Sequence, residues 1–109
     1  MYARVMTGKL SSVDKDVFER MVREQVIPRA SRLPGFKGGY WLRDLDSDRV
    51  LGVTLFESEA ALRESEEQAN RIREEASTSV GLPVPEFRSY EVVASAGQAE
   101  ESFAACEAA

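Results

Sequence analysis

The sequence predicts an α+β domain of ferredoxin-like type, with the element order βαββαβ and an antiparallel sheet. Short segments in which apolar residues alternate are separated by two longer segments with apolar residues at helical spacing. The chain has 109 residues, which is the size of a single domain. We assign the domain to residues 1–95 and a tail rich in Ala and Glu to residues 96–109, where a short helix around Phe103 or a frayed end is expected.

Six segments make up the predicted domain. Strands are expected over residues 2–9, 36–43, 49–57 and 86–95, and helices over residues 14–32 and 58–77. A polar turn joins the second and third strands into a hairpin. Ser58 is the expected N-cap of the second helix, and Pro28 is expected to end or kink the first. The adjacent Gly38 and Gly39 predict a bulge, or the close approach of another group, in the second strand.

The absence of histidine is the strongest restriction on function. It excludes a Ser-His-Asp triad, an imidazole base, a two-histidine metal site and a haem held by a proximal histidine. The single cysteine, Cys106, excludes an internal disulfide and a cysteine-cluster zinc site. We therefore expect no metal and no other cofactor. The run of glutamates in the second helix is read as a solvated face.

Charge and hydropathy set expectations about partners and compartment. Fourteen basic and nineteen acidic residues give a net charge of −5, which argues against nucleic acid and an anionic membrane as partners. The first residues lack the pattern of a signal peptide, and no apolar run is long enough to span a membrane. With the lone cysteine, these features predict a cytoplasmic protein. Cys106 has no neighbouring base in the sequence and is expected to be inert or a chance oxidation site.

Both faces of the predicted sheet carry apolar residues, although two helices can cover only one face. We assign the smaller aliphatic residues, such as Ala3 and Val5, to the face under the helices. The residues then expected on the open face are Tyr2, Arg4, Met6, Thr54 and Phe56. On a monomer this set would form a large exposed patch, so we expect a homodimer in which two sheets close on each other. The alternative is a monomer whose apolar sheet face is covered by the tail.

Several motifs carry a resemblance to a known family. They are Tyr-Ala-Arg-Val at residues 2–5, Leu-Pro-Gly-Phe at 33–36, Phe-Glu-Ser-Glu-Ala-Ala-Leu at 56–62 and Tyr-Glu-Val-Val at 90–93. Over residues 2–95 the chain resembles the antibiotic biosynthesis monooxygenase (ABM) family of dimeric α+β barrels. The resemblance implies a homodimer with a pocket between each sheet and its helices. For some members it implies oxygenation of polyketide-type phenols without metal or flavin.

Other members of that family degrade haem, and their sites look like a combination of His, Trp and Asn. This chain has Trp41 and Asn70 but no histidine. Haem degradation is therefore not expected, and chemistry that needs no imidazole remains.

Three residues are the candidates for catalysis: Trp41, Asn70 and Arg73. Trp41 offers an indole N–H and a flat aromatic face. At 100° per residue, Arg73 lies on the apolar stripe of the second helix, so it could stabilise an anion or enolate in a pocket, with Asn70 at the rim. The alternatives are that Trp41 packs in the core or at the dimer interface, and that Arg73 pairs with Glu66 at the edge of the stripe.

The residues expected to line the substrate pocket are Tyr2, Arg4, Met6, Tyr40, Thr54, Phe56 and Tyr90. A cation on a central strand must be paired or solvated, so Arg4 is expected either to bind substrate or to pair with Glu91 of the fourth strand. Tyr90 is expected to be a hydrogen-bond donor or a core residue.

Three functions fit these residues. The first is a cofactor-independent monooxygenase acting on an aromatic or polyketide-like small molecule. The second is a non-catalytic protein that binds a small apolar or aromatic ligand in the same pocket. The third is a structural homodimer whose pocket is filled by its own side chains.

Overall fold

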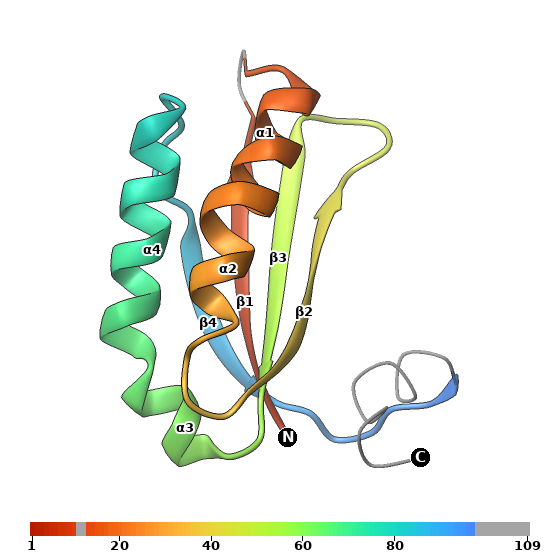
Figure 1. The fold of residues 1–109 in the computed structure, drawn as a ribbon. Helices are drawn as coiled ribbons and strands as arrows, with labels where there is room; N and C mark the ends of the chain where they lie inside the picture. The colour runs from red at the N-terminus through yellow and green to blue at the C-terminus, as the bar shows by residue number, and fades with distance from the viewer. Residues whose placement is uncertain (11–12, 98–109) are drawn as a thin grey trace.

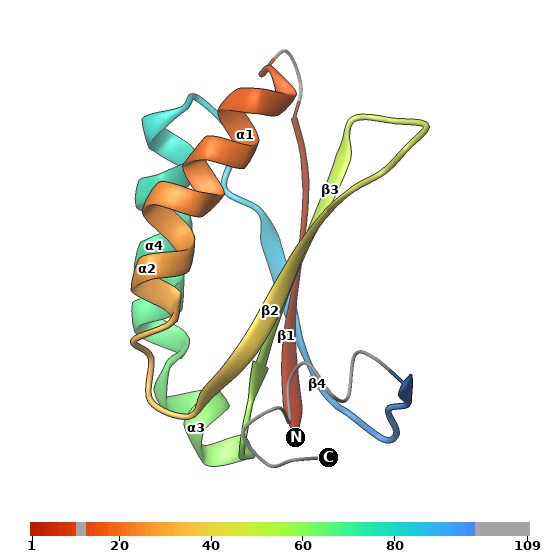
Figure 2. The same cartoon turned by 45° about the vertical axis from the view of Figure 1, so that its right-hand side comes forward.

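The computed structural model, which describes residues 1–10 and 13–97, confirms the predicted α+β ferredoxin-like fold. An antiparallel sheet has the strand order β2-β3-β1-β4, and the helices lie on one of its faces (Figure 1, Figure 2). The strands are β1 (Tyr2–Lys9), β2 (Phe36–Arg43), β3 (Arg49–Phe56) and β4 (Glu86–Glu91). The helical segments are α1 (Lys15–Met21), η1 (Val22–Val26), α2 (Ile27–Ala30), α3 (Glu59–Glu64) and α4 (Glu66–Ser79).

The first helical segment continues through Pro28, because a π-helical turn precedes that residue. Proline has no N–H to donate, and its ring clashes with the carbonyl four residues earlier. In η1 the N–H of Ile27 reaches the carbonyl of Val22, five residues back. This wider turn lets the chain pass Pro28 and begin α2, so the expected end or kink is a change of helical register. The segment ends at Ala30, two residues before the predicted end at Arg32.

The second helical segment begins where predicted, but it is divided in two. Ser58 is the N-cap of α3, and its hydroxyl accepts a hydrogen bond from the N–H of Ala61 at 3.1 Å. Ser65 ends α3 and begins α4, which the hydrophobic pattern did not predict. In the same way β4 ends at Glu91 rather than at residue 95.

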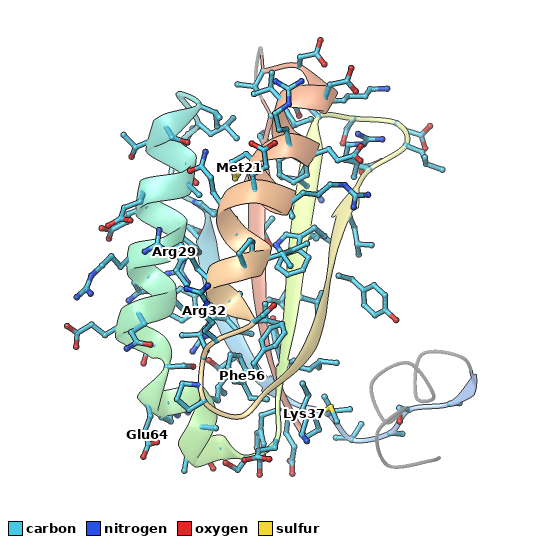
Figure 3. All side chains as sticks on the ribbon, in the orientation of Figure 1. Met21, Arg29, Arg32, Lys37, Phe56 and Glu64 are labelled. Carbon is cyan, nitrogen blue, oxygen red and sulfur yellow. The ribbon has the colours of Figure 1, made fainter. Side chains whose placement is uncertain are left out.

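The predicted assignment of residues to the two sheet faces is wrong. The core cluster contains Phe56, which is fully buried at 0 % exposure, together with Leu62 and Ile72 of the helices. Figure 3 shows Phe56 between the helices and the sheet. The residues that share its face across the β1–β3 ladder are Tyr2, Arg4, Met6, Gly52 and Thr54.

Side-chain size explains this reversal. A large side chain such as Phe56 fills the gap between the sheet and the helical layer. The smaller residues Ala3, Val5 and Val53 lie on the opposite face, which the helices leave uncovered.

Arg4 joins the central strand β1 to the junction of α3 and α4. It is 1 % exposed, and its Nη2 donates to the carbonyl oxygen of Leu62 at 2.7 Å and to Oγ of Ser65 at 3.3 Å. The expected pairing with Glu91 is wrong, because the β1–β4 register places Ser89 opposite Arg4. A guanidinium at the C-terminal end of a helix satisfies free carbonyl groups and is favoured by the helix dipole.

Two further expectations concern membrane spans and the C-terminal tail. Within residues 1–10 and 13–97, no helix has the length and apolar character that a membrane span requires. The expected helix around Phe103, and Cys106 itself, lie outside the described residues.

We predict that Arg4→Ala lowers the free energy of unfolding by about 3 kcal/mol, because it empties a buried position and leaves the Leu62 carbonyl without its donor. Arg4→Lys should recover part of this loss, since a lysine keeps the charge. Urea denaturation measures both. Arg71→Ala is the control, because Arg71 is exposed and makes only a surface ion pair with Glu67, so its loss should stay within about 0.5 kcal/mol. A loss in Arg4→Ala no larger than in Arg71→Ala would contradict the role given to Arg4.

Candidate functional site

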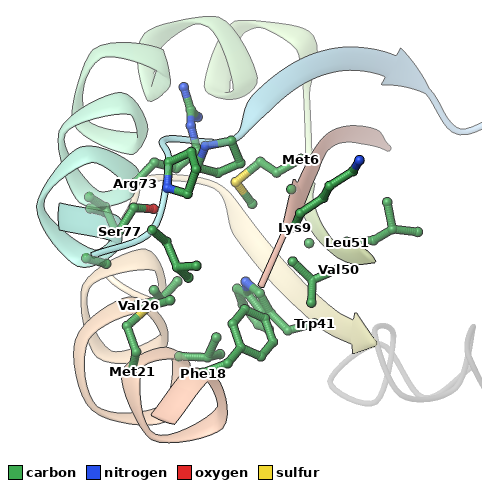
Figure 4. A pocket seen from close by; sticks show the side chains of 18 residues that line it. Met6, Lys9, Phe18, Met21, Val26, Trp41, Val50, Leu51, Arg73 and Ser77 are labelled. Atoms are coloured by element: carbon green, nitrogen blue, oxygen red, sulfur yellow. The ribbon is translucent and has the colours of Figure 1, made fainter. Parts of the chain in front are cut away.

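An apolar cavity lies between the sheet and the helical layer (Figure 4). About 70 Å³ of it can be occupied by the centre of a water molecule, which is room for several waters. Its walls come from the sheet, from the helices and from the segment that precedes β4. The sheet contributes Met6, Trp41 and Gly52; the helices contribute Phe18, Val22, Val26, Ile72 and Arg73; the segment before β4 contributes Leu82, Pro83 and Pro85. Lys9 and Arg73 are the charged wall residues, and Ser77 adds a hydroxyl.

Trp41 owes its position to two glycines. A Cβ atom at Gly39 would lie 3.0 Å from Cη2 of the indole, and one at Gly52 would lie 3.2 Å from its Cδ1 and Nε1. Both distances are too short for a comfortable contact, so the ring rests on the sheet where two side chains are absent. The register of β2 also shifts between Phe36 and Gly38. Both features expected from the adjacent glycines, a bulge and a close approach, are therefore present.

Arg73 is a buried cation on the cavity wall. It is 9 % exposed, and its Nη2 donates to Oδ1 of Asn70 one turn earlier in α4. Its guanidinium carbon lies 4.2 Å from the ring centroid of Phe87 on β4. Nε and Nη1 of Arg73 are buried and have no hydrogen-bond partner within residues 1–10 and 13–97. Burial lowers the pKa of Arg73, and the carboxylates of Glu74 and Glu66 partly offset this effect.

Arg4 and Arg73 share one aromatic ring. The guanidinium carbon of Arg4 lies 5.8 Å from the Phe87 centroid and 5.1 Å from that of Phe56. Burial, followed by repulsion from Arg73, lowers the pKa of Arg4 to about 10, so it remains charged at neutral pH. Among the described residues neither arginine has a carboxylate in salt-bridge contact. The alternative in which Arg73 forms a salt bridge with Glu66 is therefore wrong. The negative charge of Glu66 still raises the pKa of both arginines.

The predicted site residues fall into three groups. Trp41, Arg73 and Met6 line the cavity, and Asn70 holds Arg73. Thr54 and Phe56 are buried with Arg4 beneath the helices, and Tyr2 packs against the cluster around Phe56. Tyr40 and Tyr90 lie on the opposite sheet face and are 41 % and 49 % exposed, so Tyr90 is not a core residue.

Several wall residues were not predicted as part of a site. Phe18, Val22 and Val26 recur at intervals of four in the first helical segment, and this spacing already marks a helix face directed at the sheet. Phe87, which lies against Arg4 and Arg73 but does not line the cavity, could have been noticed as a large residue that alternates with polar neighbours in β4. Nothing in the sequence pattern marks Ser77 as a wall residue. In the part of the chain that the structure describes, no group of three or more Cys, Asp or Glu side chains could hold a metal ion.

Comparison with known proteins identifies the fold. No protein-family model and no curated protein matches the sequence. Solved structures do match over nearly the whole chain. A proposed antibiotic biosynthesis monooxygenase from Bordetella bronchiseptica is 18% identical, with a TM-score of 0.64, over 85% of this chain and 97% of that one. A second, from Chloroflexus aurantiacus, is 15% identical, with a TM-score of 0.60, over 88% and 96%.

A third match is a mutant form of SnoaB, a cofactor-independent oxygenase from Streptomyces nogalater. It is 18% identical, with a TM-score of 0.61, over 89% of this chain and 97% of that one. The chain shares the fold of these three structures. These identities establish the fold alone, and the resemblance noted in the sequence is supported at that level.

We predict that Gly52→Ala destabilises the protein by about 1–3 kcal/mol, because a Cβ there would lie 2.8 Å from Cε of Met6 and 3.2 Å from the indole of Trp41. Urea denaturation followed by the emission of Trp41, the single tryptophan, measures the loss. In a Met6→Ala background the same substitution should cost less, since its shortest contact is gone. Equal costs in the two backgrounds would show that Met6 is not the side chain that opposes the new methyl group.

Proposed function

We propose that this ABM-fold protein takes a single-ring phenol into the cavity and oxygenates it without a metal or flavin. The observation that carries the proposal is the joint presence of Trp41, from the sheet, and Arg73, from α4, in the lining of one apolar cavity. An aromatic ring can stack on the indole. A buried guanidinium whose Nε and Nη1 have no partner among the described residues can hold an oxyanion by charge-assisted hydrogen bonds. The fold is shared with SnoaB, whose description as a cofactor-independent oxygenase supports the same reaction class here.

The reaction needs an electron-rich substrate rather than an oxidised cofactor. Loss of the phenolic proton to solvent gives a phenolate whose ring carbon carries carbanion character. That carbon transfers one electron to O₂, and recombination of the two radicals forms a C–O bond and a hydroperoxide. Elimination of water then gives the quinone, so that phenol and O₂ become quinone and H₂O. In this scheme Arg73 stabilises the oxyanion, Asn70 orients Arg73, and Trp41 holds the ring in a site from which water is largely excluded.

A second function, ligand binding without turnover, is favoured by one specific observation. Among the described residues that line the cavity there is no Asp, Glu or Tyr, so no wall carboxylate is available as a general base. A protein that only sequesters a small phenol would use the same aromatic face and the same cation. The two functions differ only in whether O₂ is consumed.

We further propose that the open sheet face binds a second copy of the chain. The face presents Val5, Leu51 and Val53 at its centre, with Tyr40 and Leu42 on the edge strand β2. Leu42 is 45 % exposed, and an apolar sheet face of this kind is normally buried in a partner. Pairing two such faces about a two-fold axis buries both. Because the chain has a single cysteine and cannot form an internal disulfide, we propose that the dimer works in a reducing compartment, the cytoplasm.

We predict that Arg73→Ala lowers oxygen uptake with 2,4,6-trihydroxyacetophenone about 10²–10³-fold, the usual effect of removing one oxyanion donor. An oxygen electrode measures the rate, and mass spectrometry should find a product with one oxygen more and two hydrogens fewer. Arg71→Ala is the control, because Arg71 lies on the same helix in an exposed ion pair with Glu67. Thermal stabilisation by the phenol without oxygen uptake would favour ligand binding. Absence of both effects would overturn the proposed function.

We predict that Val53→Glu converts the dimer to a monomer without unfolding it. Val53 lies opposite Val5 and Tyr40 at the centre of the open face, so a dimer would bury the new carboxylates close to one another. Sedimentation velocity at micromolar concentration measures the association state, and far-UV circular dichroism checks the fold. A wild-type protein that sediments as a monomer would refute the proposed interface.

A further inference from the structure

A second hollow lies directly behind Trp41, outside the cavity. It is a groove between α1–η1 and the edge strand β2, with a volume of about 570 Å³ by the same measure. Phe18, Val22 and Trp41 line both the groove and the cavity. Figure 4 shows Trp41 and Phe18 at one side of the cavity. These three side chains are therefore the wall between the two spaces.

We propose that Trp41 is the specificity-determining residue of the cavity, because its indole closes the cavity toward the groove and restricts the ligand to one aromatic ring. The inference rests on the proposed function to the extent that the cavity must bind an aromatic ligand. It does not depend on whether that ligand is oxygenated.

The indole is the largest part of this wall, and it is only partly buried, packing against the core cluster from its edge. It rests on positions 39 and 52, where no side chain lies beneath it. Phe18 and Val22, in contrast, are buried at 8 % and 5 % exposure within a core cluster that also contains Met21 and Val50. Shortening Trp41 therefore opens the wall, whereas shortening a core residue mainly leaves a void.

The groove can accept the additional part of a longer ligand. The apolar side chains of the groove include Leu10 and Ile27 in addition to the three shared residues. Charged side chains line it as well, including Arg23, which pairs with Glu19 at 2.9 Å. A second aromatic ring that passes the position of the indole could pack against the apolar part of this lining. We infer that without the indole the cavity and the groove form one elongated site for two-ring phenols.

The test compares two ligands that differ by one ring: 4-fluorophenol and 4-(4-fluorophenyl)phenol. Fluorine NMR titration gives both affinities and does not depend on the tryptophan. Wild-type protein should bind the one-ring compound and discriminate against the two-ring compound. Trp41→Leu should raise the affinity for the two-ring compound at least tenfold relative to the one-ring compound, and Trp41→Phe should have an intermediate effect.

Met21→Ala is the matched cavity control. Met21 lines the cavity but not the groove, so its truncation adds volume without opening the wall. An equal gain in Met21→Ala would show that volume alone sets the preference, and it would overturn the proposal.

A second control tests where the additional ring lies. In a background carrying Trp41→Leu, with the sole cysteine, Cys106, replaced by serine, Arg23→Cys is labelled with a pyrene maleimide to fill the groove. Arg71→Cys, labelled in the same way, is the control. Both arginines pair with a glutamate four residues earlier, but only Arg23 lines the groove. The label at position 23 should abolish the gain for the two-ring compound, and the label at position 71 should leave it intact.

The outcomes separate this inference from the function on which it rests. If 4-fluorophenol binds but Trp41→Leu leaves the preference unchanged, Trp41 does not set ligand size and only this inference fails. If the labels at positions 23 and 71 have equal effects, the second ring does not lie in the groove, and the inference fails as well. If neither compound binds to any variant, both the inference and the proposed phenol site are refuted.

Discussion

The guanidinium of Arg4 links the central strand to the helical layer, and the position of the candidate site follows from this contact. Through Leu62 and Ser65 it binds the residues at which α3 ends and α4 begins. The direction of α4 is therefore fixed relative to β1. Asn70 and Arg73 follow within the next turns of α4. Their approach to β4 and to the cavity thus depends on a side chain that reaches across the full depth of the core.

Burying two cations around Phe87 would cost much free energy of folding if no buried group interacted with them. Arg4 is compensated by a carbonyl oxygen, a hydroxyl and two aromatic faces. Arg73 is compensated less completely, by the amide of Asn70 and one face of Phe87. Because its hydrogen-bond partner is neutral, Arg73 keeps its charge, and no described residue binds its Nε and Nη1. A carboxylate in place of Asn70 would neutralise it, and the wall would then have little attraction for an oxyanion.

The sequence was informative about elements and less so about faces. The alternation of apolar residues, their helical spacing and the capping residues predicted all four strands and both helical segments, because these signals are local. The face assignment failed since both faces are apolar and no local signal shows which one the helices cover. An arginine in a strand is normally expected to be exposed. The contacts that bury Arg4 come from residues about sixty positions away, so no local pattern indicates them. Trp41 and Arg73 were found as candidates, whereas Phe87, which lies against both arginines, was not.

Strand β2 has the features of a weak strand: two glycines, a register shift and a position at the edge of the described sheet, next to β3. Each of these costs stability, and together they explain how a tryptophan can lie flat against the sheet. A Cβ at position 39 or 52 would lift the indole toward the helices and reduce the cavity. Gly39 of this strand and Gly52 of β3 therefore set the depth at which Trp41 rests. For this reason the length of the cavity depends on one side chain at the edge of the sheet and is separate from the packing that Arg4 and Phe56 hold together.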